Sequence, residues 1–545
     1  MNRKKTISAC MVGMTVLGVG VAMPSMAEQA RPNIVLIYVD DMGLGEYGGG
    51  LIPTPAIDSL ARDGMEFTDA HTSSSVCTPS RYSILTGRYN WRSYLKSNVI
   101  GGAGSKALMT PEMMSMPAFL QQSGYHTACI GKWHLGADFE HLPKTTSNPN
   151  PDGPATGNWA MDYTQPVKNG PTDVGFDEAF WLFASLDFAP YTYFRGNKAV
   201  TVPTVNKGFR QNEHSNFMRI GPAAEDFDPS TCLETWTEEA CDYIQRRAKA
   251  PEQNPFFLYF ALTSPHTPIV PGKGFKGCYP QYSWYADFIA ETDYRVGQVL
   301  EQLQSLGLDD NTIVIFSADN GFASYVQIPK MFEAGYRPNG AWRNGKANLY
   351  EGGHRVPFLV RWPGKVKPGS RSDVTICQTD LYATFSDILG NKDTIPVNAA
   401  VDSFSFLSSL KGDSTPTRPF TIHHSINGNF AIRRGDWKLL LTDRPDVAWS
   451  LPFEKGLKTP AKLVQLYNLK DDPGETKNLE YSHPELIQVL VDQLVKAMRY
   501  GRTTPGPVQE NEGWPYKTGK HSSDVQKTIV ETFPQLGGAD QAVRD

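Results

Sequence analysis

The chain has 545 residues, enough for more than one domain and for a large hydrophobic core. Hydrophobic residues make up 40% of it and charged residues 20%, a composition that argues against both a disordered chain and a membrane bundle. The formal net charge of −5 lacks the basic excess of nucleic-acid-binding proteins, so we expect no nucleic-acid partner.

Residues 1–27 have the pattern of a secretory signal peptide. Three positive charges precede an uncharged stretch over residues 6–23, and Ser25-Met26-Ala27 resembles a cleavage site. A retained membrane anchor is the alternative, but glycines interrupt the apolar stretch, which is only marginally long enough to cross a bilayer. We expect export to the periplasm or beyond, without stable membrane insertion. The cysteines are too few for a disulfide scaffold, and Cys232 and Cys241 are either paired or buried thiols.

The predicted elements begin with an apolar, β-branched run over residues 33–39 that ends in Asp40-Asp41. This run predicts a buried parallel strand that delivers two carboxylates at its C-terminal end. A helix is predicted from Thr54, as its cap, to Gly64, with a proline at the first helical position. Residues 65–70 resemble the next strand.

Helices and strands continue to alternate up to about residue 390. The predicted elements are a helix over 117–123, a strand ending at Ile130, a strand over 256–262, a helix over 284–306 and a strand over 312–318. Such alternation predicts an α/β fold with a large, doubly wound, mostly parallel sheet and helices on both faces. We assign residues 28–390 to this domain.

A smaller α+β domain with an antiparallel sheet is predicted over residues 391–545. Its elements are a hairpin over 430–442 that turns at Gly435-Asp436, a strand at 466–469 and a helix over 484–498. The tail after Gly501 and residues 145–171 are rich in Pro, Gly, Asn and Thr, so we predict loops there.

Polar residues follow four of the predicted strands, and parallel strands would bring them to one edge of the sheet. They are Asp40-Asp41, then Lys132 and His134, then His266, then Asp319-Asn320. Carboxylate and amide oxygens, without a Cys/His pair at zinc spacing, suit Ca²⁺ or Mg²⁺, and we favour Ca²⁺. One such pair alone is typical of a turn or helix cap, but two pairs after separate buried strands indicate a metal site.

Between these pairs lies C-T-P-S-R at residues 77–81, followed by L-T-G-R at 85–88. Pro79 is placed to begin a helix whose N-terminal amides, with Arg81, favour an anion beside Cys77. A lone cysteine is more often a packed thiol, but this string is long and specific. The chain here resembles the formylglycine-dependent type I sulfatases, arylsulfatase-like enzymes of the alkaline phosphatase superfamily.

The resemblance extends over most of the chain. It runs from N-I-V-L-I-Y-V-D-D at residues 33–41 through G-K-W-H-L-G, S-P-H-T-P and A-D-N-G to N-G-K-A-N-L-Y-E-G-G-H-R-V-P at 344–357. It implies that a separate formylglycine-generating enzyme oxidises Cys77 to an aldehyde, which hydrates to a geminal diol. It also implies metal ligands at Asp40, Asp41, Asp319, Asn320 and modified Cys77.

The same resemblance implies a catalytic sequence. The metal and Arg81 help one diol hydroxyl to attack sulfur, which gives a covalent sulfo-enzyme. His134 then deprotonates the second hydroxyl, so that sulfate leaves and the aldehyde returns. His266 is expected at the departing oxygen, and Lys132 and Lys346 at sulfate and bridging oxygens.

Other polar residues have weaker claims, because a single histidine is more often a satisfied core residue. His71 belongs with them, and we expect His354 in a loop near the site. His423-His424, Arg433 and Arg434 are candidates for a substrate pocket, although packing roles are the stronger interpretation.

The substrate is open, because enzymes with this sulfate site act on phenyl sulfates, steroids and sugars. Residues 78–92 (TPSRYSILTGRYNWR) resemble bacterial carbohydrate sulfatases, which favours a sulfated carbohydrate and, within that class, a glycosaminoglycan such as chondroitin sulfate. Two alternatives remain: a phosphodiesterase or phosphonate hydrolase of the same superfamily, and a non-catalytic carbohydrate-binding relative that has lost site residues. The oligomeric state is not indicated.

Overall fold

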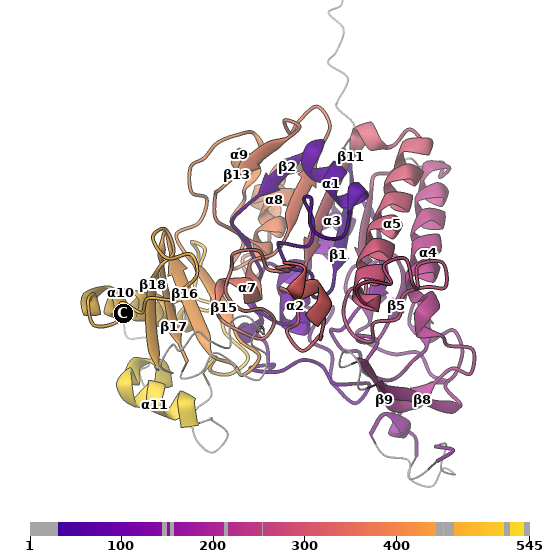
Figure 1. The fold of residues 1–545 in the computed structure, drawn as a ribbon, viewed down its shortest axis with the longest axis horizontal. Helices are drawn as coiled ribbons and strands as arrows, with labels where there is room; N and C mark the ends of the chain where they lie inside the picture. Colours follow the sequence, from indigo (N-terminus) through magenta and orange to yellow (C-terminus); the bar gives the residue numbers. More distant parts are fainter. Residues whose placement is uncertain are drawn as a thin grey trace, which may run out of the picture. The chain divides into compact units, whose positions relative to one another are not determined.

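A ten-stranded mixed sheet forms the centre of the fold (Figure 1). The computed structural model describes residues 31–143, 150–152, 157–211, 216–252, 254–442, 451, 463–516 and 524–538, so the predicted signal peptide lies outside the described residues. The strand order is β13-β2-β12-β11-β1-β10-β4-β5-β6-β7. The strands are β1 (Asn33–Val39), β2 (Met65–Phe67), β4 (His126–Lys132), β5 (Glu178–Leu182), β6 (Tyr193–Arg195), β7 (Lys198–Ala199), β10 (Phe256–Ala261), β11 (Thr312–Ala318), β12 (Phe358–Arg361) and β13 (Ser370–Ser372).

The centre of this sheet is parallel. Strands β11, β1, β10, β4 and β5 run parallel to their neighbours, whereas β12, β6 and β7 pair antiparallel towards the two edges. Strand β1 pairs with β10 and with β11, with Ile37 opposite Phe260 on one side and Phe316 on the other. The prediction of a mostly parallel sheet is confirmed.

Strand β1 is apolar throughout because both faces of the sheet are covered. Val35, Ile37 and Val39 enter one hydrophobic core, and Leu36 and Tyr38 enter the core on the other face. Helices α1 (Pro55–Arg62), α4 (Cys232–Ala248) and α5 (Trp284–Ser305) contribute to the first core. Helices α2 (Cys77–Thr86), α3 (Met116–Gln122) and α8 (Leu381–Ile388) contribute to the second, so the sheet is doubly wound.

A four-stranded antiparallel sheet forms the second part of the fold, with the order β15-β16-β17-β18. Its strands are β15 (Thr421–His424), β16 (Phe430–Arg434), β17 (Trp437–Leu441) and β18 (Val464–Asn468). Helix α10 (Pro484–Arg499) packs on it through Leu490 and Leu494, which join a core with Ile432 and Leu439. The predicted antiparallel sheet is confirmed. The division at residue 390 stays a prediction, since both sheets belong to one compact unit.

Short elements complete the described chain. Two further two-stranded sheets are β3 (Ala70–His71) with β14 (Ile376–Cys377), and β8 (Val205–Gln211) with β9 (Asn216–Ala223). The remaining α-helices are α6 (Pro329–Glu333), α7 (Glu351–His354), α9 (Leu407–Leu410) and α11 (Asp524–Thr532).

Several local predictions differ from the structure. The hydroxyl of Thr54 does not cap α1; it donates to Asp58 Oδ1 at 2.9 Å. The tail after Gly501 contains helix α11, whose buried Ile529 explains why a segment predicted as loop is helical. Residues 65–70 form a three-residue strand rather than a six-residue one.

The two cysteines that the sequence left open are free thiols on helix α4. Cys241 lies nine positions after Cys232 in the helix, a rise of roughly 13 Å. That separation is too large for a disulfide. No helix among the described residues is long and apolar enough to cross a membrane.

Gly87 ends helix α2 in the left-handed region with φ 62°. A Cβ atom there would lie 3.0 Å from the Cα of Ala400 and 3.2 Å from the Cβ of Tyr382. Only glycine satisfies both the backbone and this close approach. Gly87 therefore fixes the end of the helix that begins at Cys77.

We expect Gly87→Ala to destabilise the fold more than Gly390→Ala does. Gly390 follows α8 with a similar φ of 68°, but a Cβ there meets nothing within 4 Å. Gly390→Ala should cost about 1–2 kcal/mol from backbone strain alone, and Gly87→Ala should add a steric cost. Urea denaturation midpoints of both variants measure the difference, and equal midpoints would contradict it.

Candidate active site

The two polar pairs that follow β1 and β11 lie side by side, because these strands are neighbours with Val39 opposite Ala318. The main-chain N–H of Asp41 donates to Asp319 Oδ1 at 3.1 Å, and Asn320 Nδ2 donates to Asp41 Oδ1 at 2.7 Å. Asp41 has a φ of 67°, a left-handed conformation that aspartate tolerates better than most residues. All of these side chains are buried.

Oxygen atoms of this cluster are arranged as a cation site would require. A carboxylate oxygen of Asp40, one of Asp319 and the Sγ of Cys77 lie within 4.8 Å of one another. Asp40 Oδ1 and Asn320 Oδ1 are buried and accept no hydrogen bond from the described residues. Such acceptors are costly unless something satisfies them. Burial and the nearby Asp40 raise the pKa of Asp319. These residues fit a hard cation such as Ca²⁺.

Cys77 is the first residue of α2, and only 2% of it is exposed. Burial raises the pKa of its thiol to about 11. The thiol is therefore protonated at neutral pH, and a thiol is a far weaker nucleophile than a thiolate. The position has the geometry of a nucleophile, but the unmodified side chain lacks the reactivity.

Three buried cations surround the cluster, and each pairs with a different carboxylate. Arg81 holds Asp319 Oδ2 with Nε at 2.9 Å and Nη2 at 2.8 Å. Lys132 Nζ lies 2.5 Å from Asp40 Oδ2, and Lys346 Nζ lies 2.6 Å from Asp41 Oδ1. The structure thus brings all three predicted cations to the predicted ligands.

His134 has one engaged and one free ring nitrogen. Its Nε2 lies 2.8 Å from the carbonyl oxygen of Ile100, so Nε2 carries the proton and donates. Its buried Nδ1 has no hydrogen-bond partner among the described residues. Burial, with the charge of Lys132 next in size, holds the pKa of His134 well below its ordinary value. The neutral ring presents a lone pair at Nδ1, as a general base requires.

His266 lies beside Asp41. Its Nδ1 is 2.5 Å from the carbonyl oxygen of Thr267, which makes Nδ1 the protonated nitrogen. Its Nε2 lies 3.8 Å from Asp41 Oδ2 and 3.4 Å from the hydroxyl of Tyr325. Burial and the charge of Lys346 lower the pKa of His266 to about 4.

The sequence that forms this site matches a known family over most of its length. A family model described as Sulfatase matches residues 32–391. The chain belongs to the sulfatase family. The sulfatase is therefore a sulfuric ester hydrolase.

Two relatives and one solved structure are similar to the chain over most of its length. It is 31% identical to an N-acetylgalactosamine-6-O-sulfatase of Bacteroides thetaiotaomicron, over 85% of this chain and 92% of that protein. It is 29% identical to the N-acetylgalactosamine-6-sulfatase of Homo sapiens, over 84% of this chain and 83% of that protein. A solved structure from work on glycosaminoglycan metabolism by B. thetaiotaomicron matches with a TM-score of 0.73 and 29% identity, over 86% of this chain and 99% of that one.

Two residues near the sulfatase site were not found from the sequence. The hydroxyl of Tyr325 donates to Asp41 Oδ2 at 3.3 Å and faces His266. Buried Asp187, in the loop after β5, lies close enough to His266 for the imidazole charge to affect its pKa. Their positions after strands β11 and β5 were the available signal, but neither residue belongs to a recognisable motif.

A second buried cluster contains three histidines whose ring nitrogens lie within 4.8 Å of one another. His71 Nδ1 lies 3.0 Å from His354 Nδ1, and the two nitrogens of His423 contact Thr72 O and Thr421 Oγ1, each at 2.9 Å. Because these nitrogens are already hydrogen-bonded, the cluster is a structural network rather than a metal site. The prediction that His354 is a loop residue is wrong, since it ends helix α7.

The four candidates for a pocket in the smaller domain are mostly packed. His423 and His424 are fully buried or nearly so, and Arg433 pairs with Asp69 at 2.6 Å. Arg434 alone of the four is exposed. The packing interpretation is therefore correct for His423 and His424, whereas Arg433 and Arg434 also line a cavity of about 630 Å³.

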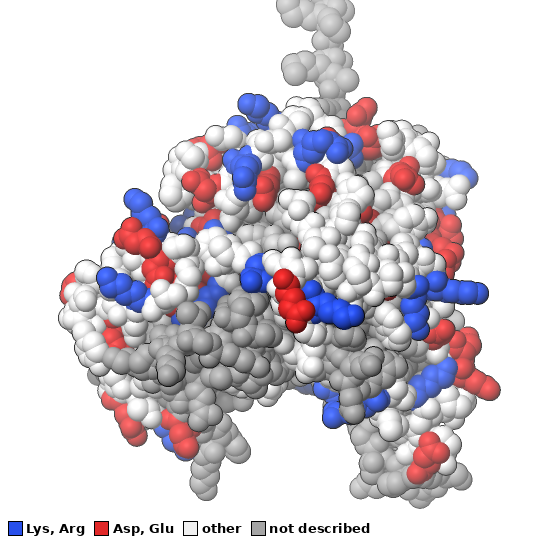
Figure 2. Space-filling view, viewed as in Figure 1, with Lys and Arg blue, Asp and Glu red and all other residues white. Residues whose placement is uncertain are grey.

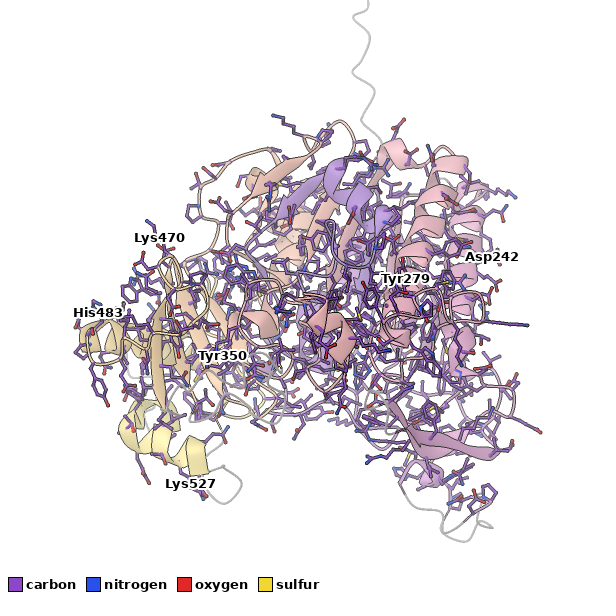
Figure 3. The ribbon with its side chains drawn as sticks, in the orientation of Figure 1. Asp242, Tyr279, Tyr350, Lys470, His483 and Lys527 are labelled. Atoms are coloured by element: carbon purple, nitrogen blue, oxygen red, sulfur yellow. The ribbon has the colours of Figure 1, made fainter. Side chains whose placement is uncertain are left out.

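The smaller sheet contacts the segment that leads to Cys77. His424 N donates to Ser73 O at 3.0 Å, Ser75 N donates to His424 O at 3.1 Å, and Ala347 N donates to Ser75 O at 2.7 Å. Tyr350, labelled in Figure 3, follows Lys346 in the chain and packs against Tyr467 of β18. Strand β15 and the Lys346 loop thus hold the approach to Cys77 from two sides.

Glu46 is buried in the loop that follows Asp41. It accepts hydrogen bonds from Gly43 N at 2.6 Å, Tyr285 OH at 2.5 Å and Tyr336 OH at 2.7 Å. Burial outweighs these bonds and raises the pKa of Glu46 from 4.5 to about 7. At pH values between 4.5 and about 7, the folded protein binds more protons at Glu46 than the unfolded chain does. The free energy of unfolding therefore falls as the pH rises through this range.

We expect Glu46→Gln to remove that part of the pH dependence. From pH 5 to pH 8 the free energy of unfolding of the wild type should fall by about 2 kcal/mol more than that of the variant. Urea denaturation at the two pH values measures this. Glu301→Gln, at an exposed position on α5, controls for loss of one charge, and the idea fails if it behaves as Glu46→Gln does.

Proposed function

We propose that the sulfatase hydrolyses the sulfate ester of a carbohydrate with formylglycine derived from Cys77 and a bound Ca²⁺. The observation that carries the proposal is the buried meeting of Cys77 with unsatisfied oxygens of Asp40 and Asn320 and with three cations. A non-catalytic relative would lack part of this set, and every expected side chain is present. The sulfatase activity named for the relatives favours a sulfate ester over a phosphodiester.

The metal ligands in this proposal are Asp40, Asp41, Asp319, Asn320 and modified Cys77. Ca²⁺ is favoured over Mg²⁺ because the donors are carboxylate and amide oxygens in a crowded set. When bound, the ion supplies a fixed positive charge that lowers the cost of ionising a hydroxyl and of placing charge on sulfate oxygens.

Oxidation of Cys77 overcomes the weak reactivity of the buried thiol. The hydrated aldehyde supplies two hydroxyl groups at the start of α2, one to attack sulfur and one to release sulfate afterwards. A formylglycine-generating enzyme would act on the C-T-P-S-R segment, which makes that enzyme the maturation partner.

The other residues bind and move protons. His134 accepts the hydroxyl proton at Nδ1, the nitrogen that has no partner in the described structure. Lys132 and Lys346 place their ammonium groups on sulfate and bridging oxygens, and the charge of Arg81 helps one diol hydroxyl to ionise before it attacks sulfur. His266 faces the departing oxygen with Nε2. The negative charge of the bound sulfate raises the proton affinity of His266, which then donates its proton to the departing oxygen.

For the substrate we propose a 6-sulfated N-acetylgalactosamine of a glycosaminoglycan such as chondroitin sulfate. The support is the activity named for two relatives of 31% and 29% identity that align over most of both chains. Export by residues 1–27 and a catalytic domain over residues 28–390 complete the proposal.

We expect Cys77→Ala to lower sulfate release from N-acetylgalactosamine 6-sulfate by at least about 10³-fold, because it removes the nucleophile. Cys129→Ala removes another buried free thiol, on β4, and should stay near wild-type activity. Mass spectrometry of the peptide with residue 77 should show the aldehyde. An unmodified thiol in fully active enzyme, or greater efficiency on an aryl phosphodiester than on an aryl sulfate, would contradict the proposal.

We expect a chelator to abolish activity and Ca²⁺ to restore it better than Mg²⁺. Asn320→Ala should raise the Ca²⁺ concentration for half-maximal activation by about 10-fold or more, since one ligand is lost. Ca²⁺ should also raise the thermal unfolding midpoint of the wild type by binding the folded state. Asp242→Asn, on the exposed face of α4 (Figure 3), is the control. A thermal unfolding midpoint of the wild type that does not change with Ca²⁺ would rule out the proposed Ca²⁺ site.

A further inference from the structure

Arg219 connects a separate hairpin to the edge of the active site. It lies on β9, which pairs only with β8 among the described strands (Figure 1). Its Nη1 donates to the carbonyl oxygen of Asp187 at 3.1 Å and also pairs with Asp187 Oδ2. The Arg219 side chain is 48% exposed, whereas that of Asp187 is 5% exposed. The hairpin thus presents to solvent one cation, Arg219, which the buried Asp187 holds in place.

Aromatic rings fix the guanidinium of Arg219. Its Cζ lies 4.0 Å from the ring centroid of Phe188 and 5.0 Å from that of Phe217. Contacts of this kind attract the cation to the ring faces and limit its rotation. The Phe188 ring in turn lies 6.0 Å, between centroids, from the ring of His134. One aromatic side chain therefore separates Arg219 from the proposed base.

Asp187, which holds Arg219, also lies close to His266. The charges of His266 and Arg219 hold the pKa of Asp187 below its ordinary value despite burial. Phe188 and Tyr325 are partly exposed and contact the rings of His134 and His266, and the half-exposed Arg219 contacts Phe188. These residues mark where the buried site meets solvent on the side that His134 and His266 share.

Arg219 retains hydrogen-bonding capacity that its anchor does not use. A guanidinium has five N–H donors, and Asp187 takes those of Nη1. Nε and Nη2 donate to no other described residue. A planar fork of this kind matches a carboxylate or sulfate group through two parallel hydrogen bonds.

Resting on the function proposed above, we propose that Arg219 binds a second anionic group of the substrate, carried by the saccharide next to the hydrolysed ester. A uronate carboxylate and a further sulfate ester share this chemistry. Figure 2 shows basic and acidic side chains interspersed over the face in view. Arg219 is thus a specificity determinant for a sulfated, acidic oligosaccharide.

The test compares Arg219→Gln with Arg210→Gln. Arg210 is an exposed arginine on β8 whose Cζ lies 5.9 Å from the Phe217 ring, so it is a matched control. The substrates are N-acetylgalactosamine 6-sulfate, the 6-sulfated disaccharide with a uronate, and the methyl ester of that disaccharide. Sulfate release gives kcat and KM for each.

Arg219→Gln should raise KM for the acidic disaccharide about 10- to 100-fold with little change in kcat, the worth of one charge-assisted pair. Turnover of the monosaccharide should change less than about 2-fold, and Arg210→Gln should change neither substrate. Wild-type enzyme should treat the methyl ester as Arg219→Gln treats the acid. If the ester binds normally but a sulfate added to the uronate ring lowers KM only when Arg219 is present, the anionic group is a sulfate and the proposal holds.

Equal losses on monosaccharide and disaccharide, or no loss on either, would overturn the inference. Thermal unfolding midpoints show whether Arg219→Gln is folded, and Arg219→Lys, which keeps charge but not the fork, should lose an intermediate amount if Gln unfolds the hairpin. A wild-type enzyme that releases sulfate from simple aryl sulfates but from none of these saccharides would overturn the carbohydrate substrate, and this inference with it. If the wild type turns over the saccharides normally and Arg219→Gln leaves KM unchanged for all of them, this inference alone is refuted and the proposed function stands.

Discussion

Three buried carboxylates at the edge of the large sheet each pair with a different cation. The pairs are Asp319 with Arg81, Asp40 with Lys132, and Asp41 with Lys346. Charges buried this completely cost several kcal/mol each unless they are paired and hydrogen-bonded. The partners come from β1, β11, α2, β4 and the loop before α7, so these elements must meet at one place for any of the charges to be tolerated. The doubly wound sheet supplies that place at the ends of its parallel strands.

The same pairs prepare the chemistry. In the proposed function, the cations that balance these carboxylates would offer their charge to sulfate oxygens when the carboxylates held a divalent cation. Ion pairs would then be exchanged rather than buried charge created, which would keep the cost of desolvation low. The histidines differ from these groups, since burial keeps both rings neutral and available for proton transfer.

The strands and the chemistry at their ends were predictable from sequence for one physical reason. A strand buried on both faces must be apolar, so the run over 33–39 and the run over 312–318 were distinct, and the polar residues after them had to meet. Tyr325 and Asp187 were not predictable, because their place beside His266 depends on loop paths that no local pattern encodes. Helix α11 was missed because its helical state depends on burial of Ile529 in a core built elsewhere. The histidine network was likewise invisible, since His71 and His423 are far apart in the chain.

Strand β15 gives the site an order of assembly. Ser75 and His424 are joined by hydrogen bonds across 349 positions of the chain, and closing so long a loop has an entropic cost that grows with its length. The proposed metal ligands, Cys77, His134 and His266 are all synthesised before β15, whose contacts hold the segment next to Cys77. Contacts of such long range form late and slowly. The contacts that hold the segment next to Cys77 therefore depend on the last quarter of the chain, and a chain cut short before β15 lacks them.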